Sequence, residues 1–157
     1  MASRREQIQL SPAEIRDFLR ASHTVILVSN GPGGYPHPMP MWFTVDDDGA
    51  VRMTTFRRSQ KILNLRRDPR VSLLVESGHE YQELKGVVLY GEAELFDGPE
   101  LLRDTLLRAS GHEPPADPKA LEAMNAVFAQ QVPKRMGIRV RPRRIVSWDH
   151  AKLGGVY

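Results

Sequence analysis

The chain of 157 residues contains no cysteine, which excludes disulfide bonds, thiolate nucleophiles and thiolate metal sites. Aromatic residues make up only 7% of the chain and its net charge is +3, whereas nucleic-acid platforms need both stacking rings and strong positive charge. No apolar run reaches membrane-spanning length, and residues 1–10 lack the apolar core of a signal peptide. We therefore expect a cytoplasmic protein that binds neither nucleic acid nor a membrane.

The familiar catalytic motifs are also missing. The five histidines have no H-x-x-x-H or H-E-x-x-H spacing, so no metal site is predicted. There is no G-x-S-x-G elbow of a serine hydrolase and no G-x-G-x-x-G after a strand. The glycines of residues 31–34 open a strand, which is typical of a hairpin turn. The sequence therefore identifies no catalytic residue.

The composition is that of one globular domain. Hydrophobic residues make up 41% and charged residues 26% of the chain, and the length suits a single core. We expect residues 1–10 to form a flexible polar N-terminal arm. Residues 11–157 show no repeat and no domain-sized linker, so we expect them to form a single cofactor-binding domain.

Apolar periodicity predicts a mainly β protein with peripheral helices. Ser11 begins a capping box with Pro12 at the first helical position. Three prolines in residues 35–45 imply an edge strand or a bulged path, and Gly86 and Gly91 lie where a long strand could bend or a ligand could approach closely. The expected strands cover residues 23–29, 35–45, 50–55, 71–75, 83–95 and 134–148, and the expected helices cover residues 12–21, 60–67, 97–109 and 120–131.

The turn before residues 60–67 is a candidate anion site. Ser59 is a favourable N-cap, and the positive end of the helix dipole lies beside it and Lys61, which we expect to be exposed at the helix start. Arg57 and Arg58 come just before. This combination suits a phosphate. The alternative is an ordinary basic turn with a normal cap, as solvated as most surface turns.

Five segments in order carry a family resemblance: S-x-K at residues 59–61, N-L-R-R-D-P-R-V-S-L-L at 64–74, G-V-V-L-Y-G-E-A-E-L at 86–95, K-R-M-G-I-R-V at 134–140 and S-W-D-H-x-K-L-G at 147–154. They resemble the pyridoxamine 5′-phosphate oxidase-like split β-barrels, which bind flavin or deazaflavin. The most similar members are the actinobacterial proteins that depend on the deazaflavin coenzyme F420. The resemblance covers residues 11–154.

The resemblance implies a split β-barrel of six to seven antiparallel strands that forms a homodimer with cofactor sites shared between subunits. The proline-bearing strand and the glycine-bent strand agree with a homodimer, because the surfaces of such strands are poorly closed unless another chain packs on them. In the family the S-x-K turn holds the phosphate, and two strands face the ring system. The cofactor-binding residues implied are Met41, Trp42, Phe43, Thr54, Thr55, Arg57, Ser59, Gln60, Lys61, Lys85, Gly86 and Trp148.

One departure bears on the choice of cofactor. Pyridoxamine phosphate oxidases carry a glutamine where this chain has Gly86, whereas deazaflavin relatives carry a small residue. The oligoglutamate tail of coenzyme F420 needs a longer cationic track, which Arg57, Arg58 and Lys85 could supply. In the family an aromatic residue at Trp148 comes from the partner subunit toward the cleft. The alternative is a core tryptophan that closes the barrel.

The function that the resemblance implies is a coenzyme F420-dependent oxidoreductase, a reductase that transfers hydride to a conjugated small molecule. In such an enzyme the cofactor carries the chemistry and the protein positions it. The proton donor is left open between Tyr81, His150 and water. Two alternatives stand beside this reading: an FMN-dependent oxidoreductase similar to pyridoxamine phosphate oxidase, and a non-catalytic carrier of flavin or deazaflavin.

Overall fold

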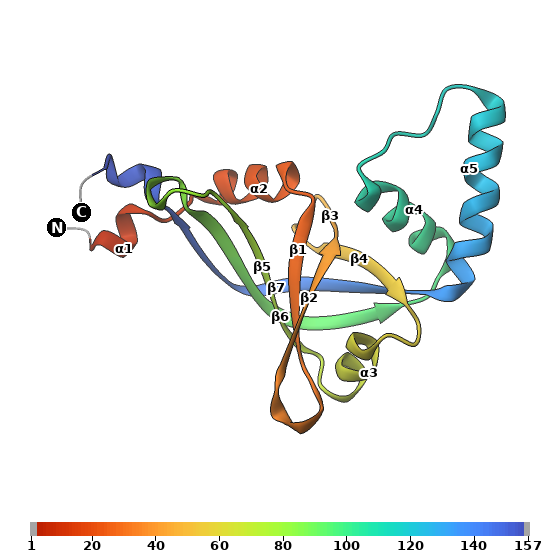
Figure 1. The fold of residues 1–157 in the computed structure, drawn as a ribbon, viewed down its shortest axis with the longest axis horizontal. Coiled ribbons are helices and arrows are strands. Elements are labelled where there is room, and N and C mark those ends of the chain that lie inside the picture. Colours follow the sequence, from red (N-terminus) through yellow and green to blue (C-terminus); the bar gives the residue numbers. More distant parts are fainter. Residues whose placement is uncertain (1–2, 156–157) are drawn as a thin grey trace.

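The computed structural model describes residues 3–155, and its centre is one curled antiparallel sheet (Figure 1). The strands follow the order β2-β1-β5-β6-β7-β4-β3. The sheet wraps into a half-barrel with helices around it, which confirms the predicted mainly β split barrel. Its strands are β1 (Thr24–Asn30), β2 (Pro36–Trp42), β3 (Thr44–Val45), β4 (Val51–Phe56), β5 (Arg70–Ser77), β6 (Lys85–Phe96) and β7 (Arg135–Asp149).

Helices lie around the rim of the sheet. In Figure 1, α4 and α5 lie together beyond one end of the long strands, and α3 lies below the end of β4. Short 3₁₀ turns occupy residues 32–34, 81–83, 132–134 and 150–153. In the described part of the chain, no helix is long and apolar enough to cross a membrane. The helices are α1 (Arg4–Gln7), α2 (Pro12–Ala21), α3 (Gln60–Arg67), α4 (Pro99–Ser110) and α5 (Pro118–Gln131).

Side-chain chemistry explains both the edge and the bend of the sheet. The prolines of β2 lie on an edge strand, as predicted, where only β1 needs their backbone groups. The β6–β7 ladder shifts register between Tyr90 and Gly91. A Cβ on Gly91 would lie 2.8 Å from the Arg141 carbonyl oxygen, so only glycine fits this close approach. The strand β6 is therefore irregular at Gly91, one of the two positions where the sequence predicts a bend or a close approach.

The core lies inside the half-barrel, between the sheet and α2 and α3. Alternate residues of the strands point into it, as a sheet with one buried face requires. Its fully buried side chains include Leu27, Met53, Ile62, Leu73, Leu89 and Ile138.

Residues 3–10, expected to be a flexible arm, are docked on the end of β7. The backbone N–H of Asp149 donates to the Ile8 carbonyl at 2.8 Å, and the N–H of Leu10 donates to Ser147 Oγ at 3.1 Å. Leu10 is only 6% exposed and belongs to the core. The mostly polar composition of this stretch concealed that one apolar residue anchors it. Residues 1–2 lie outside the described residues.

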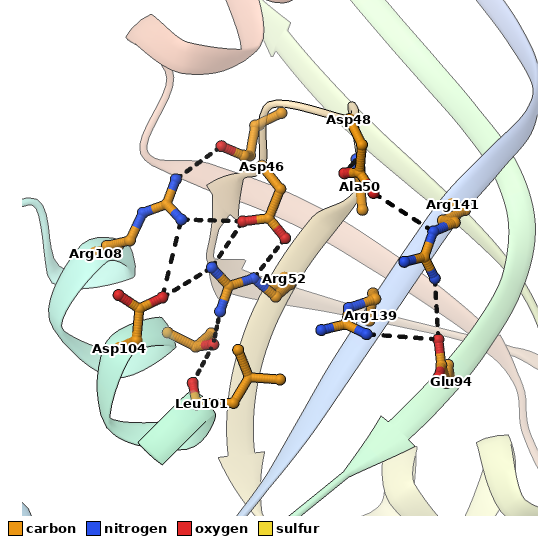
Figure 2. A network of polar contacts seen from close by, with 12 residues as sticks. Asp46, Asp48, Ala50, Arg52, Glu94, Leu101, Asp104, Arg108, Arg139 and Arg141 are labelled. Carbon is orange, nitrogen blue, oxygen red and sulfur yellow. Dashed lines mark hydrogen bonds and ion pairs between the residues drawn. The ribbon is translucent and has the colours of Figure 1, made fainter. Parts of the chain in front are cut away.

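A buried arginine joins the sheet to α4 (Figure 2). Arg52 on β4, 3% exposed, donates to both carboxylate oxygens of Asp46 at 2.7 Å. It also donates to Asp104 at 2.9 Å and to the Thr105 hydroxyl at 2.6 Å. Burial alone would raise the pKa of Asp46, but the hydrogen bonds and charge of Arg52 and Arg108 hold that pKa below its ordinary value. This cluster fixes α4 against the outer face of β4.

Replacing this arginine should therefore loosen the fold. We expect Arg52→Met to lower the free energy of unfolding by about 2–3 kcal/mol, because it removes the buried bonds to Asp46, Asp104 and Thr105 and leaves the two carboxylates with Arg108 alone. Urea denaturation measures this change. The control is Arg70→Met, since Arg70 contacts Asp68 at the same 2.7 Å but is 74% exposed; we expect it to cost less than about 1 kcal/mol. Equal effects of the two variants would contradict a structural role for the buried cluster.

Candidate cofactor site

The start of α3 has an open cap. Ser59 holds the predicted N-cap position with an extended backbone, yet its side chain accepts no hydrogen bond from the helix. Instead, Ser59 Oγ lies 3.4 Å from Thr55 Oγ1 at the end of β4. The hydroxyl that would normally satisfy an N–H of the first turn is thus turned toward the strand. First-turn N–H groups left in this way are suited to an external anion.

Lys61 is buried, contrary to the expectation of an exposed helix start. It is 7% exposed, because it shares the inward face of α3 with Ile62 and Leu65, which are buried in the core. Its Nζ donates to Thr55 Oγ1 at 3.0 Å, and no carboxylate of the described residues forms an ion pair with it. Burial lowers the pKa of Lys61. The fold therefore keeps a desolvated ammonium beside the open cap.

Neighbouring polar side chains hold α3 in place. Asn64, fully buried, donates to the Ser29 hydroxyl on β1 at 3.0 Å. Gln60 donates to Asn64 Oδ1 at 2.9 Å, so its side chain is turned along the helix. These contacts fix the position of Lys61 relative to β1 and β4.

A pocket of about 300 Å³ lies between the end of β2, β4 and α4. It brings together four residues that the resemblance assigned to the cofactor ring: Met41, Trp42, Thr54 and Thr55. Pro40 of the same strand β2 also lines it, and the sequence reasoning missed the other members, Phe56, Leu106, Ala109 and Arg135. Arg135 is the second residue of the K-R-M-G-I-R-V segment and the first of β7. Met136, Ile138 and Val140 of this segment are buried, and this alternation was the available signal that Arg135 lies on the opposite face.

Phe43 does not join this pocket. It is 4% exposed and belongs to the core, since strand alternation turns it away from Trp42. Trp42 is 57% exposed and its ring lies 4.9 Å from that of His23. Phe43 could therefore contact the cofactor ring only through its backbone.

A larger depression, of about 480 Å³, lies over β1, β5 and β6. Its two arginines are already paired: Arg70 with Asp68 at 2.7 Å and Arg143 with Glu92 at 2.9 Å. It therefore offers no free charge to a ligand, and the chemistry of the smaller pocket is better defined.

Two of the cations expected to follow the cofactor tail are engaged elsewhere. Arg57 donates to the Pro133 carbonyl at 3.0 Å and lies 3.5 Å from Asp97. Lys85 lies 3.3 Å from Asp149 and 5.3 Å from the centre of the Phe18 ring. Both charges are thus partly neutralised by the chain itself.

Gly86 and Trp148 form a second cluster at the other end of the β6–β7 ladder. They are directly opposite in register, and a Cβ on Gly86 would lie 2.2 Å from Trp148 Cζ2. The indole therefore lies across the glycine of its own chain. On β7, Trp148 is twelve positions beyond Met136, which pairs with Thr55. An extended strand covers about 35–40 Å in that number of residues, so one chain does not bring Trp148 to Lys61.

The two candidate proton donors lie at this second end. His150 Nδ1 lies 2.9 Å from the Tyr81 carbonyl oxygen, and the two rings are 4.4 Å apart. In one chain they are therefore grouped with Trp148 and not with the pocket. The described residues contain no group of histidine, aspartate and glutamate side chains that could hold a metal ion.

Comparison with known proteins identifies the family of this chain. The family model of pyridoxamine 5′-phosphate oxidase matches residues 11–149. The chain belongs to this family. It is thus an oxidoreductase of the pyridoxamine 5′-phosphate oxidase type, and its half-barrel is the split barrel of that family.

Three relatives show how far the likeness extends. The crystal structure of the conserved hypothetical protein Rv2991 from Mycobacterium tuberculosis is 39% identical, covers 99% of this chain and 95% of its own, and has a TM-score of 0.86. A 5a,11a-dehydrotetracycline/5a,11a-dehydrooxytetracycline reductase from Streptomyces rimosus is 27% identical over 83% of this chain and 78% of its own. An F420 reductase structure, 23% identical over 83% and 94% of the two chains, shares the fold with a TM-score of 0.59.

The packing of Trp148 on Gly86 can be tested directly in this oxidoreductase. We expect Gly86→Ala to lower the free energy of unfolding by about 1–3 kcal/mol, because the new methyl group displaces the indole. Tryptophan fluorescence should change with it. Gly98→Ala is the control, since a Cβ there meets nothing within 4 Å, and we expect it to cost less than about 1 kcal/mol.

A second substitution separates packing from backbone effects. If the indole is the obstacle, adding Trp148→Leu to Gly86→Ala should make the alanine nearly neutral relative to Trp148→Leu alone. The same loss in both backgrounds would show that the glycine matters for another reason.

Proposed function

We propose that this protein is a coenzyme F420-dependent reductase that transfers hydride to a conjugated small molecule. The observation that carries the proposal is Lys61, a buried ammonium whose partner in the described chain is one hydroxyl group. Burying an unpaired charge is costly, so a fold that does so is suited to an anionic ligand. The phosphate of the cofactor is an anion that could pair with this ammonium. The open cap of Ser59, on the same helix as Lys61, offers N–H groups for it.

The adjoining pocket suits the planar part of such a cofactor. Trp42 and Phe56 give it aromatic walls, and Thr54 adds a hydroxyl. Ring cofactors bind in apolar slots with a few polar groups that orient them. The bound deazaflavin would supply the hydride, while these residues exclude water and hold the ring.

Two observations support deazaflavin and a conjugated acceptor. Gly86 is filled by Trp148, so the chain has neither the glutamine of the flavin oxidases nor room for it at this position. The relative from Streptomyces rimosus is named as a reductase of dehydrotetracyclines, which are conjugated polycyclic molecules. The first observation bears on the cofactor and the second on the acceptor, and together they favour a deazaflavin-dependent reductase of a conjugated molecule.

FMN is the second candidate cofactor, and one observation favours it. Arg57 and Lys85, which would follow an oligoglutamate tail, are bonded to Asp97 and Asp149. FMN has a phosphate but no such tail, so it needs only the Lys61 site. On this alternative the protein is an FMN-dependent oxidoreductase.

We further propose a homodimer with shared cofactor sites. The predicted cofactor residues fall into two clusters at opposite ends of the β6–β7 ladder, one around Lys61 and one around Trp148. A two-fold arrangement can bring the second cluster of one subunit to the first cluster of the other. Each site would then need both chains.

Removing the Lys61 charge should separate binding from stability. We expect Lys61→Met to raise the Kd for coenzyme F420 about 10- to 100-fold, the scale of a charge-assisted hydrogen bond. The empty protein should be as stable as the wild type or more so, because the variant no longer buries an unpaired charge. Fluorescence titration and urea denaturation measure the two effects. The control is Arg66→Met, an exposed cation at the end of the same helix; an unchanged Kd in Lys61→Met would remove this residue from the site.

The reaction itself can be assayed under anaerobic conditions. We expect oxidation of reduced coenzyme F420, followed by its absorbance, with one or more members of a panel of conjugated enones, quinones and polycyclic acceptors. A 5-deazaflavin transfers hydride and reacts poorly with oxygen, so no hydrogen peroxide should form in air. The control is FMN with pyridoxamine 5′-phosphate, where peroxide production would place the protein among the flavin oxidases. Tight cofactor binding without turnover of any acceptor would instead indicate a carrier.

The shared site predicts complementation between two damaged chains. Lys61→Met and Trp148→Ala should each bind coenzyme F420 weakly as homodimers. After refolding an equal mixture, heterodimers should carry one intact and one doubly damaged site, so about a quarter of all sites should bind with wild-type affinity. Titration of tight sites against total protein gives this fraction. Recovery of none would count against sites built from both chains.

A further inference from the structure

Arg135 occupies an unusual position in the pocket. It is the first residue of β7, directly opposite Phe56 of β4, and it lines the pocket together with Trp42, Thr54 and Leu106. Its guanidinium carbon lies 4.9 Å from the centre of the Phe56 ring. The side chain therefore lies against an aromatic wall at the edge of the space that the cofactor ring would occupy.

The charge of Arg135 is not neutralised by the chain. Its Nε is buried and has no hydrogen-bond partner, and no carboxylate among residues 3–155 forms an ion pair with its side chain. Burial lowers the pKa of Arg135. Two other arginines of this region are committed: Arg52 to Asp46 and Asp104, and Arg57 to Asp97.

The contrast with Arg52 is informative, because both arginines lie on the outward face of the β4–β7 pair. Arg52 has two carboxylate partners and a hydroxyl, and it serves to dock α4. Arg135 has only the face of Phe56, which stabilises a cation weakly compared with an anion. A structural arginine would be expected to resemble Arg52. Arg135 instead has unused donors that face a pocket with aromatic walls.

We propose that Arg135 is a specificity determinant that binds the deazaflavin ring in its ionised form and so favours coenzyme F420 over FMN. This inference rests on the proposed function. The deazaflavin ring of coenzyme F420 bears a phenolic hydroxyl that can ionise, with the charge delocalised over the planar ring, whereas the flavin ring carries methyl groups in that region. A planar cation next to aromatic walls matches a planar delocalised anion in both charge and shape.

The two cofactors are therefore matched probes, since both carry the phosphate and a similar ring. We expect Arg135→Met to raise the Kd of oxidised coenzyme F420 about tenfold at pH 8 and the Kd of oxidised FMN less than about threefold. Arg144→Met is the matched control, because Arg144 also lies on β7 over an aromatic ring, at 5.2 Å from Tyr90, but outside the pocket. It should change neither Kd.

A spectroscopic readout distinguishes the ring from the acidic tail. The absorbance of coenzyme F420 follows the ionisation of its ring, so a pH titration of the bound cofactor gives the ring pKa. We expect that pKa to lie about one unit lower on the wild type than in solution and to return toward the free value in Arg135→Met, since tenfold in affinity equals one pKa unit. Arg135→Lys, which keeps the charge, should retain most of the shift.

The outcomes are separable from those of the proposed function. If coenzyme F420 binds the wild type with the ring pKa of the free cofactor, Arg135 does not select the ionised ring, although the reductase proposal stands. Equal loss of both cofactors in Arg135→Met would also overturn the inference, because it would show a role in shape alone. If Arg135→Met does not fold, the wild-type ring pKa and Arg135→Lys still decide the question. Failure of coenzyme F420 to bind the wild type would refute the proposed function instead.

Discussion

The β6–β7 ladder is the constraint on which the rest of the structure depends. It joins the β2–β1–β5 side of the sheet to the β4–β3 side, and its register shifts at Gly91. The same two strands carry Trp148 and Gly86 at one end, and at the other end β7 pairs with Thr54 and Thr55. Their length therefore separates the two clusters of predicted cofactor residues. A cofactor that needs both clusters would require a second subunit.

Local signals in the sequence were enough to predict much of this fold. The capping box at Ser11, the prolines of β2 and the glycine at position 91 each act through the backbone within a few residues. The docking of residues 3–10 was not predictable in this way. It depends on contacts such as Leu10 with Ser147, which are 137 residues apart in sequence, and on one buried leucine in a polar stretch.

The sequence predicted which residues could bind the cofactor better than it predicted how buried those residues are. Resemblance assigned Lys61 to a phosphate, but its burial follows from helical spacing with Ile62 and Leu65, a pattern that the sequence already contained. Arg135 was missed because it looked like one of many surface arginines. Its neighbours Met136, Ile138 and Val140 are buried on the inward face, and what the outward face meets depends on how α4 is docked. That docking depends on Arg52, whose partners come from distant segments.

Stability and ligand binding are linked through two unpaired cations on opposite faces of β4. Lys61 bonds Thr55 on the inward face, and Arg135 lies by Phe56 on the outward face. Each charge costs free energy in the protein without a ligand, because burial weakens its hydration without supplying a counter-charge. An anionic ligand that reaches both would recover that cost on binding and stabilise the folded chain by mass action. The Arg52 cluster and the pairing with β7 hold β4 in place, and β4 in turn holds both cations before the ligand arrives. The entropy cost of ordering these side chains is therefore met during folding and does not reduce the affinity for the ligand.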